Sequence, residues 1–151
     1  FYHHFKNFDV YLTALADYYG TEQAQQLFLE ARDDSGDDPA RLLRNATNLF
    51  GTRAGRQLNI AMRFWGNNDE RAAAAVRRYD AVLAENLMTI FGELGFDRTA
   101  AKSRTVVMLG LASLEFDSTL LDTELHELWP FIRDNMLLPR SDGLLASPQL
   151  A

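Results

Sequence analysis

Cysteine is absent from the chain, so disulfide bonds, thiol catalysis and cysteine-ligated zinc sites are excluded. Histidine is scarce, with three residues of which two are adjacent, and we therefore do not expect a histidine-built metal site. No apolar run approaches the roughly 18 residues of a membrane-spanning helix, and a charged-then-apolar secretory signal is missing. These absences predict a cytoplasmic protein without membrane contact and without a cofactor.

Positive charge is also in short supply. The chain has 15 Lys and Arg against 21 Asp and Glu, which gives a net charge of −6. Proteins bind the phosphate backbone of nucleic acids through clustered Lys and Arg. These 151 residues are therefore not expected to bind nucleic acid by themselves.

The sequence patterns that would indicate an enzyme are incomplete. His126 and Glu127 begin like a zinc-peptidase helix, but Pro130 stands where the second histidine would be. The acidic segment Asp33–Asp38 has Gly36 at its fourth position, whereas a calcium-binding loop has glycine at its sixth. No glycine-rich phosphate loop follows a strand, and no Ser, His and Asp pattern suggests a triad. We therefore predict that the chain is not an enzyme.

What the chain does contain is apolar residues at helical spacing, with almost no strand alternation. The pattern predicts an all-α fold of about seven helices. Their expected ranges are Asp9–Tyr19, Glu22–Asp33, Pro39–Phe50, Arg53–Trp65, a long helix from an Asn67/Glu70 capping box to about Leu94, Arg98 to about Phe116, and Thr123–Leu137. Gly20, Gly51 and Gly95 are expected to end helices, and Thr21, Asp38 and Asp97 to cap them. Pro130 is expected to kink or split the last helix.

The first residues, Phe1-Tyr2-His3-His4-Phe5-Lys6-Asn7, carry a resemblance to a known family. This segment resembles the exit from the DNA-binding helix-turn-helix of TetR-family transcriptional repressors, where the pattern is roughly Leu/Phe-Tyr-x-His-Phe-Lys-Asn-Lys-Asp/Glu. Residues 62–69 resemble the segment before the first long helix of that family, and residues 92–96 resemble its Leu-Gly-Phe hinge. The chain departs from the pattern at Phe8, where the family often has a lysine that contacts DNA phosphate.

The resemblance implies a TetR-type C-terminal regulatory bundle with two long dimerisation helices. Residues 1–7 would be a remnant of the helix-turn-helix, residues 8–138 the ligand-binding and dimerisation domain, and residues 139–151 a loose tail. Operator DNA would be bound only through an N-terminal domain preceding Phe1. By position in the family, Tyr2, His4 and Lys6 would lie near DNA phosphates; alternatively, Tyr2, His4 and Phe5 pack the two domains together. In such a repressor, an effector moves the linker helix, here Asp9–Tyr19, and releases the DNA.

Large apolar and aromatic side chains on the linker helix and the next three helices predict a pocket for a small apolar or aromatic effector. The candidate ligand-binding residues are Tyr11, Leu15, Tyr18, Phe28, Leu43, Phe50, Leu58, Asn59, Met62 and Trp65. Tyr18, Met62 and Trp65 are the preferred candidates, since a buried hydroxyl or indole N–H needs a partner that a ligand can supply. Any one of these residues can instead be an ordinary core residue.

The long helix near residues 70–94 and the helix after it have apolar residues on more than one face, which predicts a homodimer. The candidate interface residues are Leu83, Leu87, Ile90, Phe91, Val106, Leu109, Gly110 and Ser113. The alternative is a central helix that is internal to a monomer. The function predicted from all these features is a ligand-responsive repressor. The alternative functions are a helical small-molecule-binding module and a dimerisation module, both without a DNA function.

Overall fold

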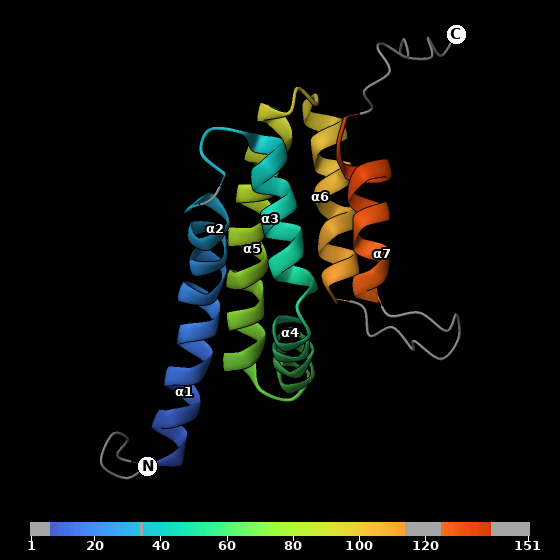
Figure 1. Ribbon diagram of the computed structural model, residues 1–151. Coiled ribbons are helices and arrows are strands. Elements are labelled where there is room, and N and C mark those ends of the chain that lie inside the picture. The colour runs from blue at the N-terminus through green and yellow to red at the C-terminus, as the bar shows by residue number, and fades with distance from the viewer. Residues whose placement is uncertain (1–6, 34, 114–124, 140–151) are drawn as a thin grey trace, which may run out of the picture.

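The computed structural model describes residues 7–33, 35–113 and 125–139, and all regular structure in these ranges is helical (Figure 1). The elements are α1 Phe8–Tyr18, the π-helical turn η1 Tyr19–Gln23, α2 Ala24–Asp33, α3 Pro39–Gly51, α4 Arg53–Gly66, α5 Glu70–Glu93, α6 Arg98–Ser113, α7 Leu125–Ile132 and the π-helical turn η3 Arg133–Leu137. The prediction of an all-α fold is confirmed. The candidate phosphate contacts Tyr2, His4 and Lys6, and the tail beyond Pro139, lie outside the described residues.

The helix α5 is the centre of the bundle. It packs against α1, η1, α2, α3, α4 and α6, and Figure 1 shows it running through the middle of the molecule. Seven of its side chains are buried: Ala72, Ala75, Tyr79, Leu83, Leu87, Ile90 and Phe91. The broad apolar surface of α5 is therefore covered by helices of its own chain, which corresponds to the alternative of an internal central helix.

Several helix ends follow the sequence signals. Asp38 caps α3, because its Oδ1 accepts hydrogen bonds from the backbone N–H groups of Ala40 (2.9 Å) and Arg41 (3.2 Å). Asp97 caps α6 by accepting from the N–H of Ala100 at 2.8 Å. Gly95 follows α5 with a φ of 87°, a left-handed conformation that glycine adopts without steric cost. These three predictions are confirmed.

Gly20 does not end a helix, contrary to the prediction. The chain continues from α1 through η1 into α2, and Thr21 is no cap, since its hydroxyl donates to the carbonyl of Asp17 at 2.7 Å. Gly20 is instead buried against α5, where an added Cβ would lie 2.9 Å from the Cα of Ala75. The glycine at this position permits close helix packing.

One further helix boundary differs from the prediction, whereas the last helix is interrupted close to Pro130, as expected. The N-cap of α5 is Asp69 and not Asn67, because the Asp69 carboxylate accepts from the N–H of Arg71 at 2.9 Å. Pro130 lies inside α7, and the irregularity follows it as the π-turn η3. In α5 the capping residue is therefore Asp69, the acidic residue directly before the helix, which is consistent with the preference for anionic groups at helix N-termini.

Candidate ligand site

A cavity of about 270 Å³ lies where η1, α2, the junction of α3 and α4, α5 and the end of α6 meet. Its lining residues are Tyr19, Gln23, Gln26, Leu27, Glu30, Leu49, Phe50, Thr52, Ala54, Gly55, Arg56, Leu58, Asn59, Tyr79 and Ala112. Protein pockets for small molecules typically have volumes from about 300 to 1,000 Å³. The cavity lies just below that range and is therefore suited only to a small ligand.

A network of hydrogen bonds at the cavity wall joins four elements of the fold. The Tyr19 hydroxyl donates to Asn59 Oδ1 at 2.7 Å, and Asn59 Nδ2 donates to the carbonyl of Ala112 at 2.6 Å. Arg63 Nε also donates to Asn59 Oδ1, at 3.1 Å. The Arg63 guanidinium forms a two-pronged ion pair with Asp80, with N–O distances of 3.0 and 2.5 Å. Asn59 therefore connects η1, α4 and α6 directly, and α5 through Arg63.

Two tyrosine rings are stacked at the same wall. The Tyr19 and Tyr79 ring centroids are 4.5 Å apart, with an angle of 17° between the ring planes. Burial raises the pKa of Tyr79 from 10.0 to about 12. Burial also raises the pKa of Tyr19, and the neighbouring Tyr79 adds to that shift. Both phenols are therefore neutral at physiological pH, and the Tyr19 hydroxyl remains a hydrogen-bond donor.

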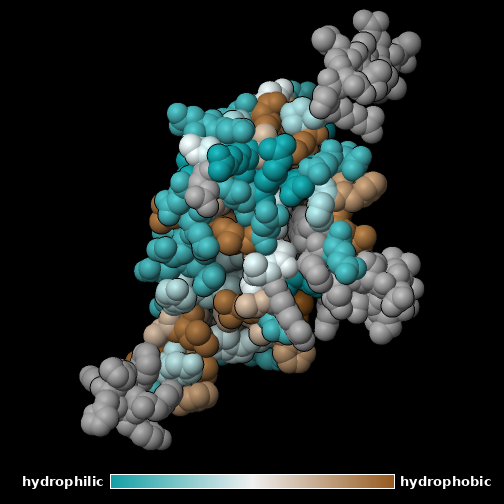
Figure 2. Space-filling view, in the orientation of Figure 1, coloured by the Kyte–Doolittle hydropathy of each residue, from teal (hydrophilic) through white to brown (hydrophobic). Residues whose placement is uncertain are grey.

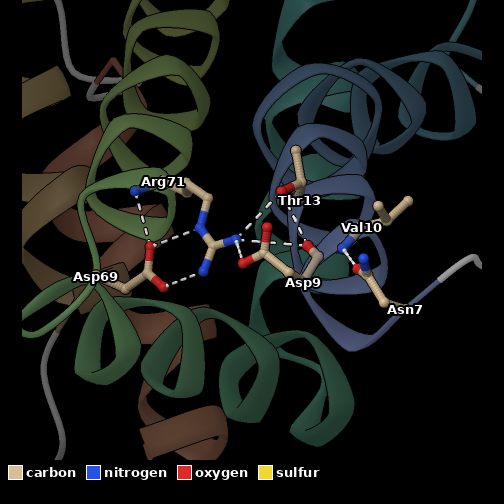
Figure 3. Close-up of polar contacts among 6 residues, drawn as sticks. All are labelled: Asn7, Asp9, Val10, Thr13, Asp69 and Arg71. Carbon is tan, nitrogen blue, oxygen red and sulfur yellow. Dashed lines mark hydrogen bonds and ion pairs between the residues drawn. The ribbon is translucent and has the colours of Figure 1, made fainter.

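A second polar cluster fixes the N-terminal part of α1 to the start of α5 (Figure 3). Arg71 forms ion pairs with Asp9 at 2.6 Å and with Asp69 at 2.8 Å, and its Nη1 also donates to the Thr13 hydroxyl at 3.2 Å. The hydrogen bonds from the Arg71 guanidinium lower the pKa of Asp69 from 3.8 to about 2. The same carboxylate thus caps α5 and orients the arginine that binds α1.

Two more contacts continue this attachment along α1 and η1. Asp17 pairs with Arg78 at 3.1 Å, about two helical turns beyond Arg71 on α5. In η1, just after the end of α1, Gly20 approaches the backbone of Ala75, which lies between Arg71 and Arg78 on α5. We call these three contacts, Asp9–Arg71, Asp17–Arg78 and Gly20–Ala75, the α1 clasp. Both ion pairs of the clasp are partly exposed to solvent, whereas the contact between Gly20 and Ala75 is buried.

Three of the ten candidate ligand-binding residues line the cavity, namely Phe50, Leu58 and Asn59. The other seven are not among its lining residues. Phe28, Leu43 and Met62 are buried in the core, Trp65 packs partly buried against the core, and Tyr11 and Leu15 are half-buried on α1. Tyr18 is 53% exposed, contrary to the expectation of a buried hydroxyl, because the adjacent Tyr19 is the tyrosine that points into the protein.

Tyr19, Tyr79 and the polar lining residues other than Asn59 were not predicted from the sequence. The only signal for Tyr19 was its position next to Gly20, since a glycine marks a site of close backbone approach. The polar residues Gln23, Gln26 and Thr52 carry no pattern that distinguishes them from surface residues.

The candidate dimer residues fall into two groups. Leu83, Leu87, Ile90 and Phe91 of α5 are almost fully buried within the single chain, so they leave no surface for a second copy. On α6, Leu109 and Ser113 are half-buried, while Val106 and Gly110 are exposed. Exposed apolar residues continue on α7 and η3, where Phe131 is 65% and Met136 is 50% exposed. Figure 2, which shows one face of the molecule, is largely hydrophilic over α2 and α3, with apolar side chains gathered over α1.

Within the described ranges, no cluster of three or more His, Asp or Glu side chains is arranged to hold a metal ion. None of the described helices combines the length and the apolar character that crossing a membrane requires. Comparison with protein-family models, curated proteins and solved structures gave no match for this chain. The functional assignment therefore depends on the cavity, its hydrogen-bond network and the α1 clasp.

Proposed function

We propose that the chain is the ligand-binding and dimerisation part of a cytoplasmic transcriptional repressor of the TetR type. The observation that carries the proposal is the position of Tyr19. Its ring lines the cavity, its hydroxyl belongs to the buried network, and its backbone continues directly into α1. A ligand in the cavity is therefore in direct contact with η1, which continues into the helix α1 that, by resemblance, leads to a DNA-binding domain.

The mechanism follows from this connection. The α1 clasp holds α1 and η1 against α5, and the Tyr19–Asn59 hydrogen bond holds η1 against α4. A ligand that binds better when Tyr19 has moved shifts the population towards a state with α1 released, whereas equal affinity for both states changes nothing. Coupling free energies between sites are typically about 1–3 kcal/mol. Partly exposed ion pairs contribute little to stability, so the clasp does not prevent a shift of that size.

The proposal includes a homodimer that uses α6 and α7 and not α5. Val106, Phe131 and Met136 are large apolar side chains that remain exposed on these two elements and η3. We propose that these three side chains belong to one surface that a second copy covers, because contiguous exposed apolar surface marks an interaction site and a two-fold dimer is the commonest arrangement. A dimer would set the separation of two DNA-binding domains, as operator recognition by this class of protein requires.

DNA selection tests the function. The product of the natural gene, including whatever it encodes before Phe1, is incubated with random duplex DNA and the bound fraction is sequenced over several rounds. We expect enrichment of an inverted repeat, because a two-fold dimer binds two equivalent half-sites. A protein that enriches no sequence while still binding small molecules in its cavity would instead be a ligand-binding module without a DNA function.

A further inference from the structure

The cavity also indicates what kind of molecule it binds. We propose that its ligand is a small uncharged molecule with an apolar body of about one aromatic ring and a hydroxyl group that binds between Asn59 and Tyr19. This inference rests on the proposed function, since it names the ligand class of the same site. It is drawn from the volume, the apolar wall and the unused hydrogen-bonding capacity of the lining residues.

The volume limits the size of the ligand. An apolar cavity of about 150 Å³ in another protein is large enough to bind benzene. The cavity here, at about 270 Å³, accommodates one ring with short substituents. Much of its wall is apolar and fits such a body: Leu27, Leu49, Phe50, Ala54, Leu58 and the ring of Tyr79. The lining charges are one acidic and one basic side chain, Glu30 and Arg56, so the wall has no net charge that would select an ion.

The hydrogen-bonding capacity of two lining residues selects the polar group. Asn59 Oδ1 already accepts from Tyr19 and Arg63, which uses both of its lone pairs. Asn59 Nδ2 has two hydrogens and donates one to Ala112, so one N–H donor remains among the described contacts. The Tyr19 oxygen has donated its only hydrogen and can still accept. The wall thus offers one donor and one acceptor.

A hydroxyl group satisfies both of these groups at once. Tyr19 Oη lies 2.7 Å from Asn59 Oδ1, and the oxygen and nitrogen of one amide are about 2.3 Å apart, so the free donor and acceptor are within about 5 Å. A single hydroxyl oxygen can accept from Asn59 Nδ2–H and donate to Tyr19 Oη across that distance. A carboxylate cannot donate, and the nearest guanidinium of the network, Arg63, is already paired with Asp80.

The test compares p-cresol with toluene, which has the same shape without the hydroxyl. Each is titrated into the full chain, and dissociation constants are obtained from the chemical-shift changes of amide signals, including the Asn59 side chain. One or two neutral hydrogen bonds change affinity by about 2- to 10-fold each, so we expect p-cresol to bind roughly 5- to 10-fold more tightly. In Tyr19→Phe this preference should fall at least twofold.

Tyr18→Phe is the matched control, because it removes the same atom from an exposed neighbouring tyrosine and should keep the full preference. Equal binding of p-cresol and toluene would overturn the hydroxyl inference while leaving a ligand-binding cavity. Tighter binding of 4-methylbenzoate than of p-cresol would overturn the requirement for an uncharged ligand. Failure of every probe to bind at millimolar concentration would overturn the site itself. None of these outcomes depends on DNA binding, which the selection experiment measures separately.

Discussion

Replacing Gly20 with alanine measures how closely α1 and η1 are packed on α5. The new Cβ would lie 2.9 Å from Ala75 Cα and 3.0 Å from both Ala75 O and Arg78 Nε. Two of these three neighbours are backbone atoms, which cannot move aside as a flexible side chain can. Overpacking of this kind costs about 1–3 kcal/mol, and the higher helix propensity of alanine returns up to about 1 kcal/mol. We expect a net loss of roughly 1–2 kcal/mol.

Thermal unfolding measures this loss. For a chain of this size, 1 kcal/mol shifts Tm by about 2–4 °C, so Gly20→Ala should lower Tm by roughly 2–8 °C. Hydrogen exchange of the α1 amides should accelerate at the same time, because the clasp is weakened. Gly92→Ala is the control, since no heavy atom lies within 4 Å of its Cβ position, and it should raise Tm slightly. A Gly20→Ala protein as stable as the wild type would refute the close packing.

Four further predictions address charge, pH and assembly. Arg71→Ala should raise the pKa of Asp69 from about 2 towards 3.8 in a carbonyl NMR titration, and it should speed amide hydrogen exchange in α1. The control Arg77→Ala removes an exposed cation of the same helix and should change neither the pKa of Asp69 nor the exchange. In the wild type, the depressed pKa of Asp69 means that its contribution to stability is present above about pH 4 and is lost as pH falls towards 2; an Asp69 midpoint near 3.8 would contradict the geometry. The raised pKa of Tyr79 means that its contribution is intact below pH 10.0 and is lost as pH rises towards 12, and absorbance at 295 nm should show no ionisation of this residue near pH 10 in the folded protein. Val106→Asp should shift sedimentation from dimer to monomer without lowering helix content; an unchanged dimer would show that α6 is not the interface.

The parts of the fold that the sequence predicted are those governed by local chemistry. Asp38 before Pro39 and Asp97 before α6 cap their helices because a short acidic side chain reaches the free N–H groups of the next turn. Gly95 ends α5 because it adopts a positive φ. Each of these signals involves residues within four positions of one another, so no knowledge of distant neighbours was needed.

The parts that could not be predicted depend on contacts between distant segments. Gly20 looks like a helix end in sequence, and its packing against Ala75 is invisible there. A helix with a wide apolar surface such as α5 can be covered by a second subunit or by its own chain, and the amino-acid pattern is the same in both cases. The choice between Tyr18 and Tyr19 as the inward tyrosine was equally undetermined, because each lies at helical spacing from apolar residues of the same segment.

The helices α1 and α2 form one continuous helical segment, which the π-helical turn η1 interrupts with a single wider turn. A π-helical turn contains one residue more than an α-helical turn, and each residue of an α-helix turns the chain by about 100°. The wider turn accommodates its additional residue, so deleting one residue between positions 19 and 23 would leave α1 in nearly the same orientation. A deletion inside α2, where no wider turn absorbs it, would rotate everything upstream by about 100°. Asp9 and Asp17 would then face away from Arg71 and Arg78 although no charged group had been changed. The orientation of whatever α1 carries is thus encoded in chain length as well as in side-chain identity.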